Sequence, residues 1–488
     1  MSDKNGGQQD DVEAEVDLEG LEEDRTVQIK SPVSGIDSAT GAGMTLDFTA
    51  RSLFARRTHK RVRSELPAYL AIQCSWYMAF GLQMVLFPYL ITNRLGLNGT
   101  ELGLANMALS GPSVVFLLIG GVVAERARSK PLLMVLHLAA ALPAAGLAWI
   151  LATGNLAYGF MILYGIAMGT VGAFMMPARD SVLNEVVDRR SRVGSGVTLQ
   201  QGVAFATIAQ FAAQIMGLII GGYADKLTRM PDWLGGFSVG PIPSWELLSF
   251  QAMIVALGTG FAVFLARGRS VRTGRSGLGA AFGDIHEGFQ VVLANAKLWA
   301  MTALMFGVGI FVIGSFLVVL PIINRDIYGL ASDGIRDMFV TFWMGAFVSS
   351  VALSVFRNIK RQGRLLLTAQ LLGSLAILIM LAKPPHWVFL TIVFVWGLAG
   401  GVSIAMSRSI VQDAAPKDQL ARVLSIYQLG FMAGAPFGAA IMGWLVDFFP
   451  EQPQRVAIVP ALGMTMLIVW MIARTPIWNM KSITSEKA

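Results

Sequence analysis

The stretch Leu102–Lys130, LGLANMALSGPSVVFLLIGGVVAERARSK, decides the class of fold. Its first 23 residues carry no charge. Four charged residues then follow within six positions: Glu125, Arg126, Arg128 and Lys130. As a helix, the uncharged run would be about 34 Å long, whereas the hydrocarbon core of a bilayer is about 30 Å thick. The stretch therefore predicts a membrane-spanning helix that ends at a charged membrane surface.

Uncharged runs of about 20 residues recur along the whole chain. The chain has 488 residues, 54% of them hydrophobic and only 14% charged, whereas soluble domains carry about 25% charged residues. We therefore expect an all-α membrane protein with twelve transmembrane helices arranged as two six-helix halves. The expected spans are 67–92, 102–124, 131–152, 156–178, 196–221, 247–266, 298–323, 338–356, 365–382, 387–406, 424–446 and 456–473.

Lys and Arg are distributed unevenly between the two expected sides of the membrane. If the N-terminus is cytoplasmic, 28 of the 38 basic residues lie in cytoplasmic segments, seven lie in outer loops and three in the distal N-terminal tail. The positive-inside rule then predicts a multi-pass protein of the plasma (cytoplasmic) membrane with both termini cytoplasmic. We read the basic residues as topology signals facing the lipid bilayer, and we expect no nucleic-acid partner.

Segments outside the spans divide the chain further. The N-terminal tail is acidic and expected to be disordered up to Asp24, and basic and amphipathic nearer the first span. That basic part is either a short interfacial helix or a topology anchor without fixed structure. The expected segments are the cytoplasmic tail 1–64, the N-terminal half 65–266, a cytoplasmic loop 267–297, the C-terminal half 298–474 and a cytoplasmic tail 475–488.

The two halves resemble each other around their fourth and fifth spans. MMPARDSVLNEVVDRRSRVGSG ends span 4, and IAMSRSIVQDAAPKDQLARVLS ends span 10. Arg179 and Arg408 occupy matching places in them, and the spans that follow both finish on an aspartate, Asp225 and Asp447. Repeats of six spans around a central site are common in transporters.

With these features, the chain resembles the major facilitator superfamily of transporters over about residues 65–474. That family carries the pattern G-x-L-A-D-R-x-G-R-K between spans 2 and 3. The chain has Gly121, Ala124, Arg126 and Lys130 at matching places, with Glu125, Arg128 and Ser129 as its clearest departures. Within the superfamily, DIHEGFQVV and PARDSVLNEVV are similar to bacterial exporters of the enterobactin-exporter and macrolide-efflux type.

The resemblance implies a gate at the cytoplasmic ends of spans 2 and 11. A carboxylate at the membrane boundary is tolerable where it meets bases or a helix N-terminus, so Glu125 is expected near Arg422. Gly120 and Gly121 would allow close helix approach there. The implied gate residues are Gly121, Glu125, Arg126, Lys130, Gly363, Arg364 and Arg422. The alternative is a positively charged loop with one incidental acid.

The superfamily also implies a central cavity lined by spans 1, 4, 7 and 10. In span 1, an amide, aromatic rings and a thioether share one helical face. Such walls suit an amphipathic or cationic organic molecule, although the same side chains also fill helix interfaces. The expected cavity residues are Gln73, Tyr77, Phe80, Met84, Tyr164, Met168, Phe311, Ser315, Trp396 and Ser403.

Three titratable residues are candidates for coupling to a proton. His137 is the imidazole expected inside the bilayer, and Asp180 and Glu185 lie at the inner end of span 4. The alternative for His137 is a hydrogen bond to a neighbouring helix. Many drug/proton antiporters of the superfamily carry a membrane acid or a span-4 arginine. Neither is evident in the predicted span cores, which weighs against proton antiport.

We expect a secondary active transporter that moves a small amphipathic organic compound by alternating access, as a monomeric exporter. An importer of a small solute and a non-transporting receptor or scaffold on the same fold remain alternatives. The sequence has no G-x-x-x-x-G-K-[ST] motif and no Cys/His cluster with metal spacing. We therefore expect no enzyme activity, no cofactor and no metal site.

Overall fold

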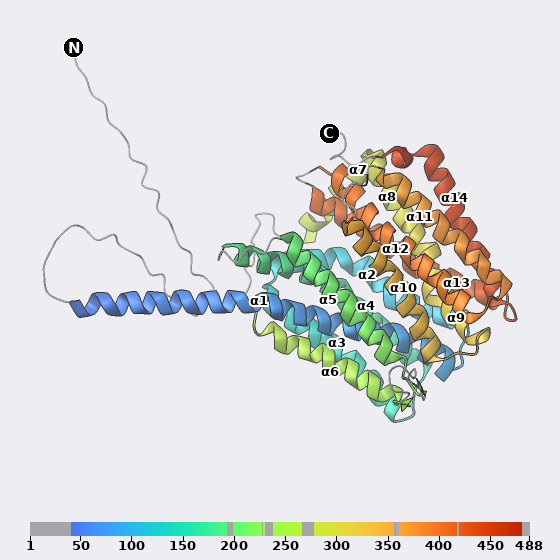
Figure 1. Cartoon of the computed structure of the whole chain (residues 1–488), viewed down its shortest axis with the longest axis horizontal. Helices are drawn as coiled ribbons and strands as arrows, with labels where there is room; N and C mark the ends of the chain where they lie inside the picture. Colours follow the sequence, from blue (N-terminus) through green and yellow to red (C-terminus); the bar gives the residue numbers. More distant parts are fainter. Residues whose placement is uncertain are drawn as a thin grey trace, which may run out of the picture.

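The computed structural model describes residues 41–192, 199–226, 228–229, 238–265, 278–355, 359, 361–416 and 419–480. These residues are almost entirely α-helical (Figure 1). The strands that they contain, β1 (Thr228–Arg229) and β2 (Ser238–Val239), form one short antiparallel pair with Thr228 opposite Val239. The acidic part of the N-terminal tail lies outside the described residues.

The N-terminal half consists of the helices α1 to α6. Their bounds are α1 Gly41–Tyr89, continued by the π-helical turn η1 Leu90–Arg94, α2 Gly99–Arg126, α3 Ser129–Ala152, α4 Tyr158–Arg192, α5 Leu199–Gly221 and α6 Ser244–Ala262. The amphipathic helix α7, Leu278–Ala294, follows in the loop between the halves.

The C-terminal half begins with α8. Its elements are α8 Ala296–Gly307 with η3 Val308–Ile313, η4 Ser315–Val319 and α9 Leu320–Asp326, then α10 Ser332–Val355, α11 Gln362–Ala376 with η5 Ile377–Ala382, α12 His386–Ala414, α13 Leu420–Asp447, η6 Pro453–Ala457 with α14 Ile458–Arg474, and η7 Pro476–Asn479. Helix α8 and the three elements after it form one continuous span.

Within the described residues, eleven helices are long and apolar enough to cross a membrane. They coincide with eleven of the twelve expected spans. The remaining expected span, 338–356, coincides with α10, a helix of 24 residues whose first turns carry Asp333, Arg336 and Asp337. The expected all-α architecture of membrane-length helices is therefore confirmed.

Local chemistry explains where several helices begin and end. Gly96, with φ of +66°, ends the first span in a conformation that favours glycine. Asn98 and Glu101 then form a capping box at the start of α2. The side chain of Asn295 accepts a hydrogen bond from the backbone N–H of Lys297 at 3.0 Å, so a helix cap separates α7 from α8.

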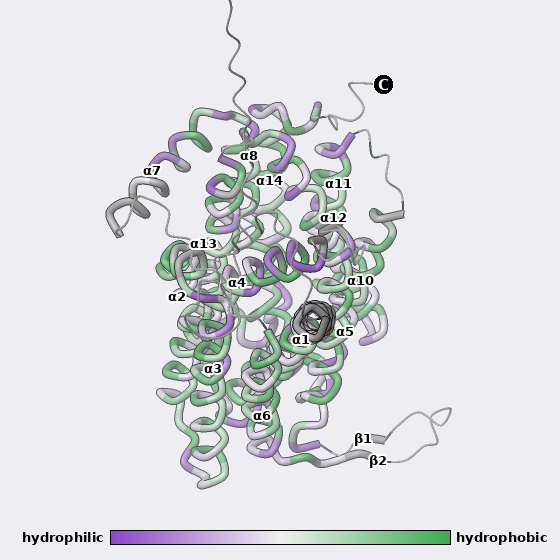
Figure 2. Tube along the Cα trace, turned by 90° about the vertical axis from the view of Figure 1, so that its left-hand side faces the viewer, coloured by the Kyte–Doolittle hydropathy of each residue, from purple (hydrophilic) through white to green (hydrophobic). Residues whose placement is uncertain are grey.

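The exposed surface of the helices is strongly apolar. Leu142 on α3 and Trp149 on the same helix are each 73% exposed, which in water would cost roughly 25 cal/mol per Å² of apolar surface. Figure 2 shows mostly hydrophobic residues along the membrane-length helices, whereas hydrophilic residues are more frequent near their ends and α7 contains both kinds. These faces are suited to contact with lipid.

Helices α2 and α13 form a close contact between the halves. A Cβ atom added at Gly103 of α2 would overlap the carbonyl oxygen of Ala439 on α13, and one added at Gly443 would overlap that of Gly99. Small residues therefore let the two backbones touch, as in many membrane helix pairs. We call the end of the bundle with Gly99 and Asp447 the outer end and the end with Lys130 and Glu185 the inner end, following the predicted topology.

Candidate substrate site and gates

A buried arginine on α4 joins two of the expected cavity residues on α1. Arg179 is 4% exposed, and its Nη1 donates to Oε1 of Gln73 at 3.0 Å. Its Nη2 donates to the hydroxyl of Tyr77 at 3.1 Å. The guanidinium carbon lies 4.6 Å from the ring centroid of Tyr77 and 5.8 Å from that of Trp76. Gln73 and Tyr77 meet the same cation because they are one helical turn apart.

The partners of this guanidinium are neutral. Among the described residues no carboxylate forms an ion pair with Arg179, and its Nε is buried without a hydrogen-bond acceptor. The neighbouring Asp180 has an exposed side chain and attracts Arg179 only through space. A buried cation without a carboxylate partner is costly, and ionisable groups in this position usually serve function.

The prediction that span 4 carries no arginine was wrong. The uncharged run ends at 178, but α4 continues to Arg192 and its membrane-length segment reaches Arg190. Arg179 therefore lies within the helix and not in a loop. The usable signal was the lack of a glycine C-cap in the sequence until Gly194, because helices commonly end at such a residue.

The other expected cavity residues of the N-terminal half take part in contacts between its helices. The hydroxyl of Tyr164 donates to Oε1 of Gln83 at 3.2 Å and accepts from Nε2 of Gln251 at 2.9 Å. The sulfur of Met84 accepts from Nε2 of Gln214 at 3.5 Å. Met168 is buried, whereas Phe80 is exposed. The glutamines Gln83 and Gln251 were not among the expected site residues.

The expected cavity residues of the C-terminal half contact their own half. Phe311 lies against Gly463 of α14, and Trp396 is buried with its ring centroid 6.0 Å from that of Phe316. Ser403 accepts a hydrogen bond from Nε2 of Gln370 at 2.7 Å. Ser315 is buried in the π-helical turn η4. The structure thus brings Gln73 and Tyr77 together around Arg179 and places these four residues elsewhere.

The three candidates for proton coupling lie in different settings. Nδ1 of His137 donates to the carbonyl of Leu133 at 2.8 Å, and the ring is fully buried. Asp180 is exposed, and its carboxylate interacts electrostatically with Arg408 on α12, in the other half. Oε1 of Glu185 accepts from the Ser129 hydroxyl at 2.6 Å.

Glu185 belongs to a charged cluster at the inner end of the N-terminal half. Its Oε2 lies 3.2 Å from Nη1 of Arg189. Nε of the same arginine lies 2.9 Å from Oε2 of Glu65, which is 1% exposed. Arg189 therefore offsets the charge of a buried carboxylate on α1 and ties α1 to α4.

The residues expected to form the inner gate are only partly described. The side chains of Glu125 and Arg126 lie outside the described residues. Nζ of Lys130 donates to the carbonyl of Val263 at 2.7 Å, and Nη1 of Arg422 pairs with Oε2 of Glu287 on α7 at 2.9 Å.

The two glycines before the charged loop have different surroundings. A Cβ at Gly120 would lie 2.7 Å from the carbonyl oxygen of Ala173, on α4 of the same half. A Cβ at Gly121 would meet no atom within 4 Å. Gly120 therefore allows close approach to α4 in this conformation, and the approach of these glycines to span 11 stays a prediction.

The C-terminal counterpart of this loop holds the end of the chain. Gly363 lies against the backbone of Ile477 in η7, where a Cβ would overlap the carbonyl oxygen. Nε of Arg364 donates to the carbonyl of Trp478 at 3.4 Å, and its guanidinium lies 5.3 Å from that ring. Residues 475–480, expected to be part of a tail, thus pack against α11.

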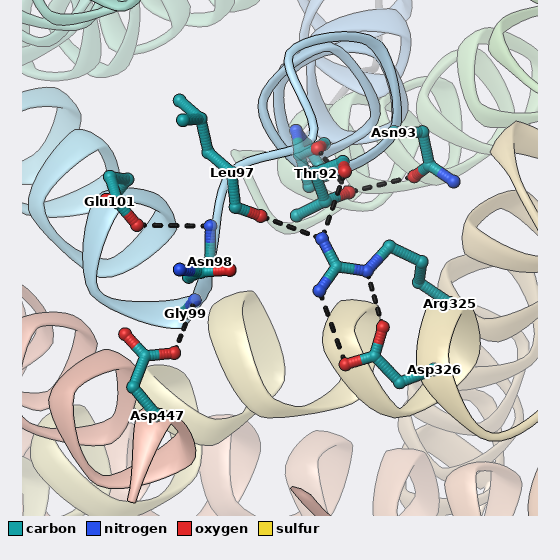
Figure 3. A network of polar contacts seen from close by, with 10 residues as sticks. Thr92, Asn93, Leu97, Asn98, Gly99, Glu101, Arg325, Asp326 and Asp447 are labelled. Atoms are coloured by element: carbon teal, nitrogen blue, oxygen red, sulfur yellow. Dashed lines mark hydrogen bonds and ion pairs between the residues drawn. The ribbon is translucent and has the colours of Figure 1, made fainter. Parts of the chain in front are cut away.

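Charged contacts join the two halves at the outer end. Oδ1 of Asp447 accepts a hydrogen bond from the backbone N–H of Gly99 at 2.9 Å (Figure 3). Its Oδ2 accepts one from the backbone N–H of Thr100 at 2.8 Å, so Asp447 caps α2. Nη1 of Arg325 donates to the carbonyls of Thr92 and Leu97, at 3.0 and 2.7 Å. These carbonyls lie at the end of the first span, where the last backbone carbonyls of a helix have no N–H partner within the helix.

A second group of contacts extends this outer closure to α5 and α10. Nζ of Lys226 lies 2.6 Å from Oδ2 of Asp333. The hydroxyl of Ser332 donates to the carbonyl of Ala224 at 2.8 Å. We call the contacts of Asp447, Arg325, Lys226 and Ser332 the outer clasp. Beside it, the guanidinium of Arg336 on α10 lies 5.8 Å from the ring centroid of Tyr223 in the N-terminal half.

The family of the chain follows from comparison with known proteins. The family model of the Major Facilitator Superfamily matches residues 69–362 and 359–487. The chain therefore belongs to the major facilitator superfamily, whose members are multi-pass membrane transporters of small molecules. None of the curated proteins compared with the chain matches it.

Solved structures share the fold at low sequence identity. The nucleoside transporter NupG has a TM-score of 0.62 and 14% identity over 85% of this chain and 98% of its own. A bacterial homologue of the human lysosomal transporter Spinster, inward-facing and unoccupied, has a TM-score of 0.62 and 11% identity over 86% and 96%. The D-xylose-proton symporter has a TM-score of 0.60 and 13% identity over 86% and 98%.

Proposed function

We propose that the chain is a secondary active transporter that carries a small amphipathic organic compound across the plasma membrane by alternating access. The observation that carries this proposal is the outer clasp. It joins the halves through side chains that water can replace when the halves separate. An exposed ion pair contributes about 0–1 kcal/mol, and a carboxylate at a helix N-terminus up to about 2 kcal/mol. A sum of a few kcal/mol suits an equilibrium between two conformations.

We further propose that the transporter is a monomeric exporter. The support is the similarity of DIHEGFQVV and PARDSVLNEVV to exporters, together with a closure that lies at the outer end and would leave loading to the cytoplasmic side. Proton-coupled uptake is the second candidate, because one structural neighbour is a proton symporter. Asp180, exposed between Arg179 and Arg408, is the carboxylate through which a proton would act.

A crosslink across the outer clasp tests alternating access. Lys226→Cys and Asp333→Cys, in a Cys74→Ala background, replace an ion pair of 2.6 Å and leave no other cysteine. A bifunctional thiol reagent should join the halves and stop transport of an amphipathic dye in everted vesicles, and reduction of a cleavable linker should restore it. Each single-cysteine variant treated alike is the control. Undiminished transport by fully crosslinked protein would refute the mechanism.

The same vesicles distinguish export from uptake. Export predicts that dye accumulates inside everted vesicles when a proton gradient is imposed, and that collapsing the gradient abolishes accumulation. Accumulation in right-side-out vesicles alone would favour the importer. Asp180→Asn should weaken the dependence on the gradient if that carboxylate carries the proton.

A further inference from the structure

The surroundings of Arg179 raise the question of what its charge is for. A guanidinium has five N–H donors, and here two of them meet the neutral oxygens of Gln73 and Tyr77. The buried Nε has no acceptor among the described residues. A tie between α1 and α4 alone would need no charge, because a neutral amide makes equivalent hydrogen bonds at lower desolvation cost.

A carboxylate next to the arginine also interacts with a second guanidinium. Asp180 has the exposed side chain of α4 nearest in sequence, and Arg408 of α12 acts on that carboxylate from the other half. The charge of the Asp180 carboxylate is therefore shared between the guanidinium groups of Arg179 and Arg408. One negative charge from outside the chain would balance them.

Aromatic rings accompany the charge. The Tyr77 ring lies under the guanidinium and is only half-buried, and the exposed Phe80 ring packs against it edge to face at 6.3 Å between centroids. A ligand that reaches Arg179 past Tyr77 thus meets a cation at one end and apolar rings at the other. This combination suits an organic acid and is repulsive to an organic cation.

We propose that Arg179 binds the anionic group of the transported compound, which is an amphipathic organic acid with a carboxylate or an equivalent anionic group. The proposal rests on the proposed transport function and specifies its substrate class. Gln73 and Tyr77 orient the guanidinium, the free Nε with its neighbouring Nη group receives the two oxygens of the anion, and Phe80 contacts the apolar part of the ligand. The sequence alone also allowed a cationic substrate, and the proposal excludes it because the positive charge of Arg179 would repel a cation.

Ligand-dependent stability of the full-length protein in detergent tests this site without transport. The probes are benzoate, 4-phenylbutyrate and octanoate, each beside its methyl ester, with 4-phenylbutylamine as the matched cation. At least one carboxylate should raise the thermal unfolding midpoint, and its ester and the amine should not. Arg179→Gln should weaken the apparent affinity about tenfold or more, since a charge-assisted hydrogen bond is lost. Arg179→Lys should retain part of the affinity because it keeps the charge without the fork.

Arg189→Gln supplies the matched control. It removes another arginine from α4 and leaves Glu65 unpaired, so it should lower the midpoint of the free protein while the shift caused by the carboxylate persists. Equal shifts by acid and ester, a larger shift by the amine, no shift by any of the three acids, or an unchanged shift in Arg179→Gln would each overturn the proposal. Failure here leaves the crosslinking test of transport standing, so the two proposals can fail separately.

Discussion

Asp225 and Asp447 occupy matching places at the ends of the fifth and eleventh spans, yet they stabilise different things. The carboxylate of Asp225 accepts from the backbone N–H of Ser244 at 3.0 Å and from the Tyr89 hydroxyl at 3.3 Å, all within the N-terminal half. The carboxylate of Asp447 caps α2, in the other half. The aspartate at the end of the repeated span therefore stabilises the N-terminal half internally at Asp225, but joins the two halves at Asp447.

The same contrast applies to close helix approaches. A Cβ at Gly169 of α4 would overlap the carbonyl oxygen of Leu109 on α2, within one half. A Cβ at Gly103 of α2 would overlap the carbonyl oxygen of Ala439, across the halves. If the halves move as units, contacts of the first kind contribute to folding and contacts of the second kind to the balance between conformations.

The largest expected effects come from these two glycines. Gly169→Ala should lower the thermal unfolding midpoint, because the α2 and α4 backbones must separate and overpacking typically costs about 1–3 kcal/mol. Gly103→Ala meets an obstacle of the same kind but can avoid it by opening the outer end. It should leave the midpoint nearly unchanged and speed labelling of a Val446→Cys reporter, which is buried in the closed form. Equal destabilisation by both would contradict units that move as rigid bodies.

The aspartate pair should show the same division with smaller effects. Asp225→Asn loses a charge-assisted contact to the start of α6. It should lower the free energy of unfolding by about 1–2 kcal/mol, and the thermal unfolding midpoint with it. Asp225 has φ of +51°, a region that asparagine also tolerates, so backbone strain does not confuse the comparison. Asp447→Asn should instead speed labelling of Val446→Cys by up to about tenfold, as a bias of about 1.4 kcal/mol predicts. A midpoint loss in Asp447→Asn as large as that in Asp225→Asn would mean that the clasp belongs to the folded core.

The sequence predicted the two aspartates but not their different targets. Charge-free runs and the repeated Asp225 and Asp447 are local features, and they located the spans and the two-half architecture well. The partner of Asp447 is Gly99, nearly 350 residues away, and no local pattern identifies it. Arg179 was misplaced because a count of uncharged residues ends a span at the first charge, whereas the helix itself needs a cap to stop.

The sequence also did not predict which neighbouring helix each residue of a span faces. Gly120 and Gly121 are adjacent, so they point about 100° apart on a helix and only one of them can face α4. Trp396 and Tyr77 are both aromatic residues of spans expected to line a cavity, yet one is buried among aromatic rings and the other stacks on a guanidinium. Their residue types fit either role, and only the neighbouring helices decide between them.

The smallest effect should come from the ion pair between Lys226 and Asp333, which extends the same clasp. Burial opposes ionisation of the Asp333 carboxyl, but the hydrogen bond and charge of Lys226, with backbone N–H groups, outweigh it and hold its pKa below the ordinary 3.8. A carboxyl whose pKa is lowered in the closed form favours that form at every pH above the ordinary value, and loses this effect only as the pH falls through the lowered pKa. The Lys226 side chain is 39% exposed, so the pair contributes about 0–1 kcal/mol.

Asp333→Asn should therefore raise the labelling rate of Val446→Cys no more than about fivefold, less than Asp447→Asn does. The ratio between variant and parent should be the same at pH 5.5 and pH 7.5, because the carboxyl is ionised at both. Lys226→Met is the matched control and should give a similar ratio, since it breaks the same pair from the other side. A ratio that falls to one at pH 5.5 would show that Asp333 is already protonated there and that the pair does not hold the outer end closed.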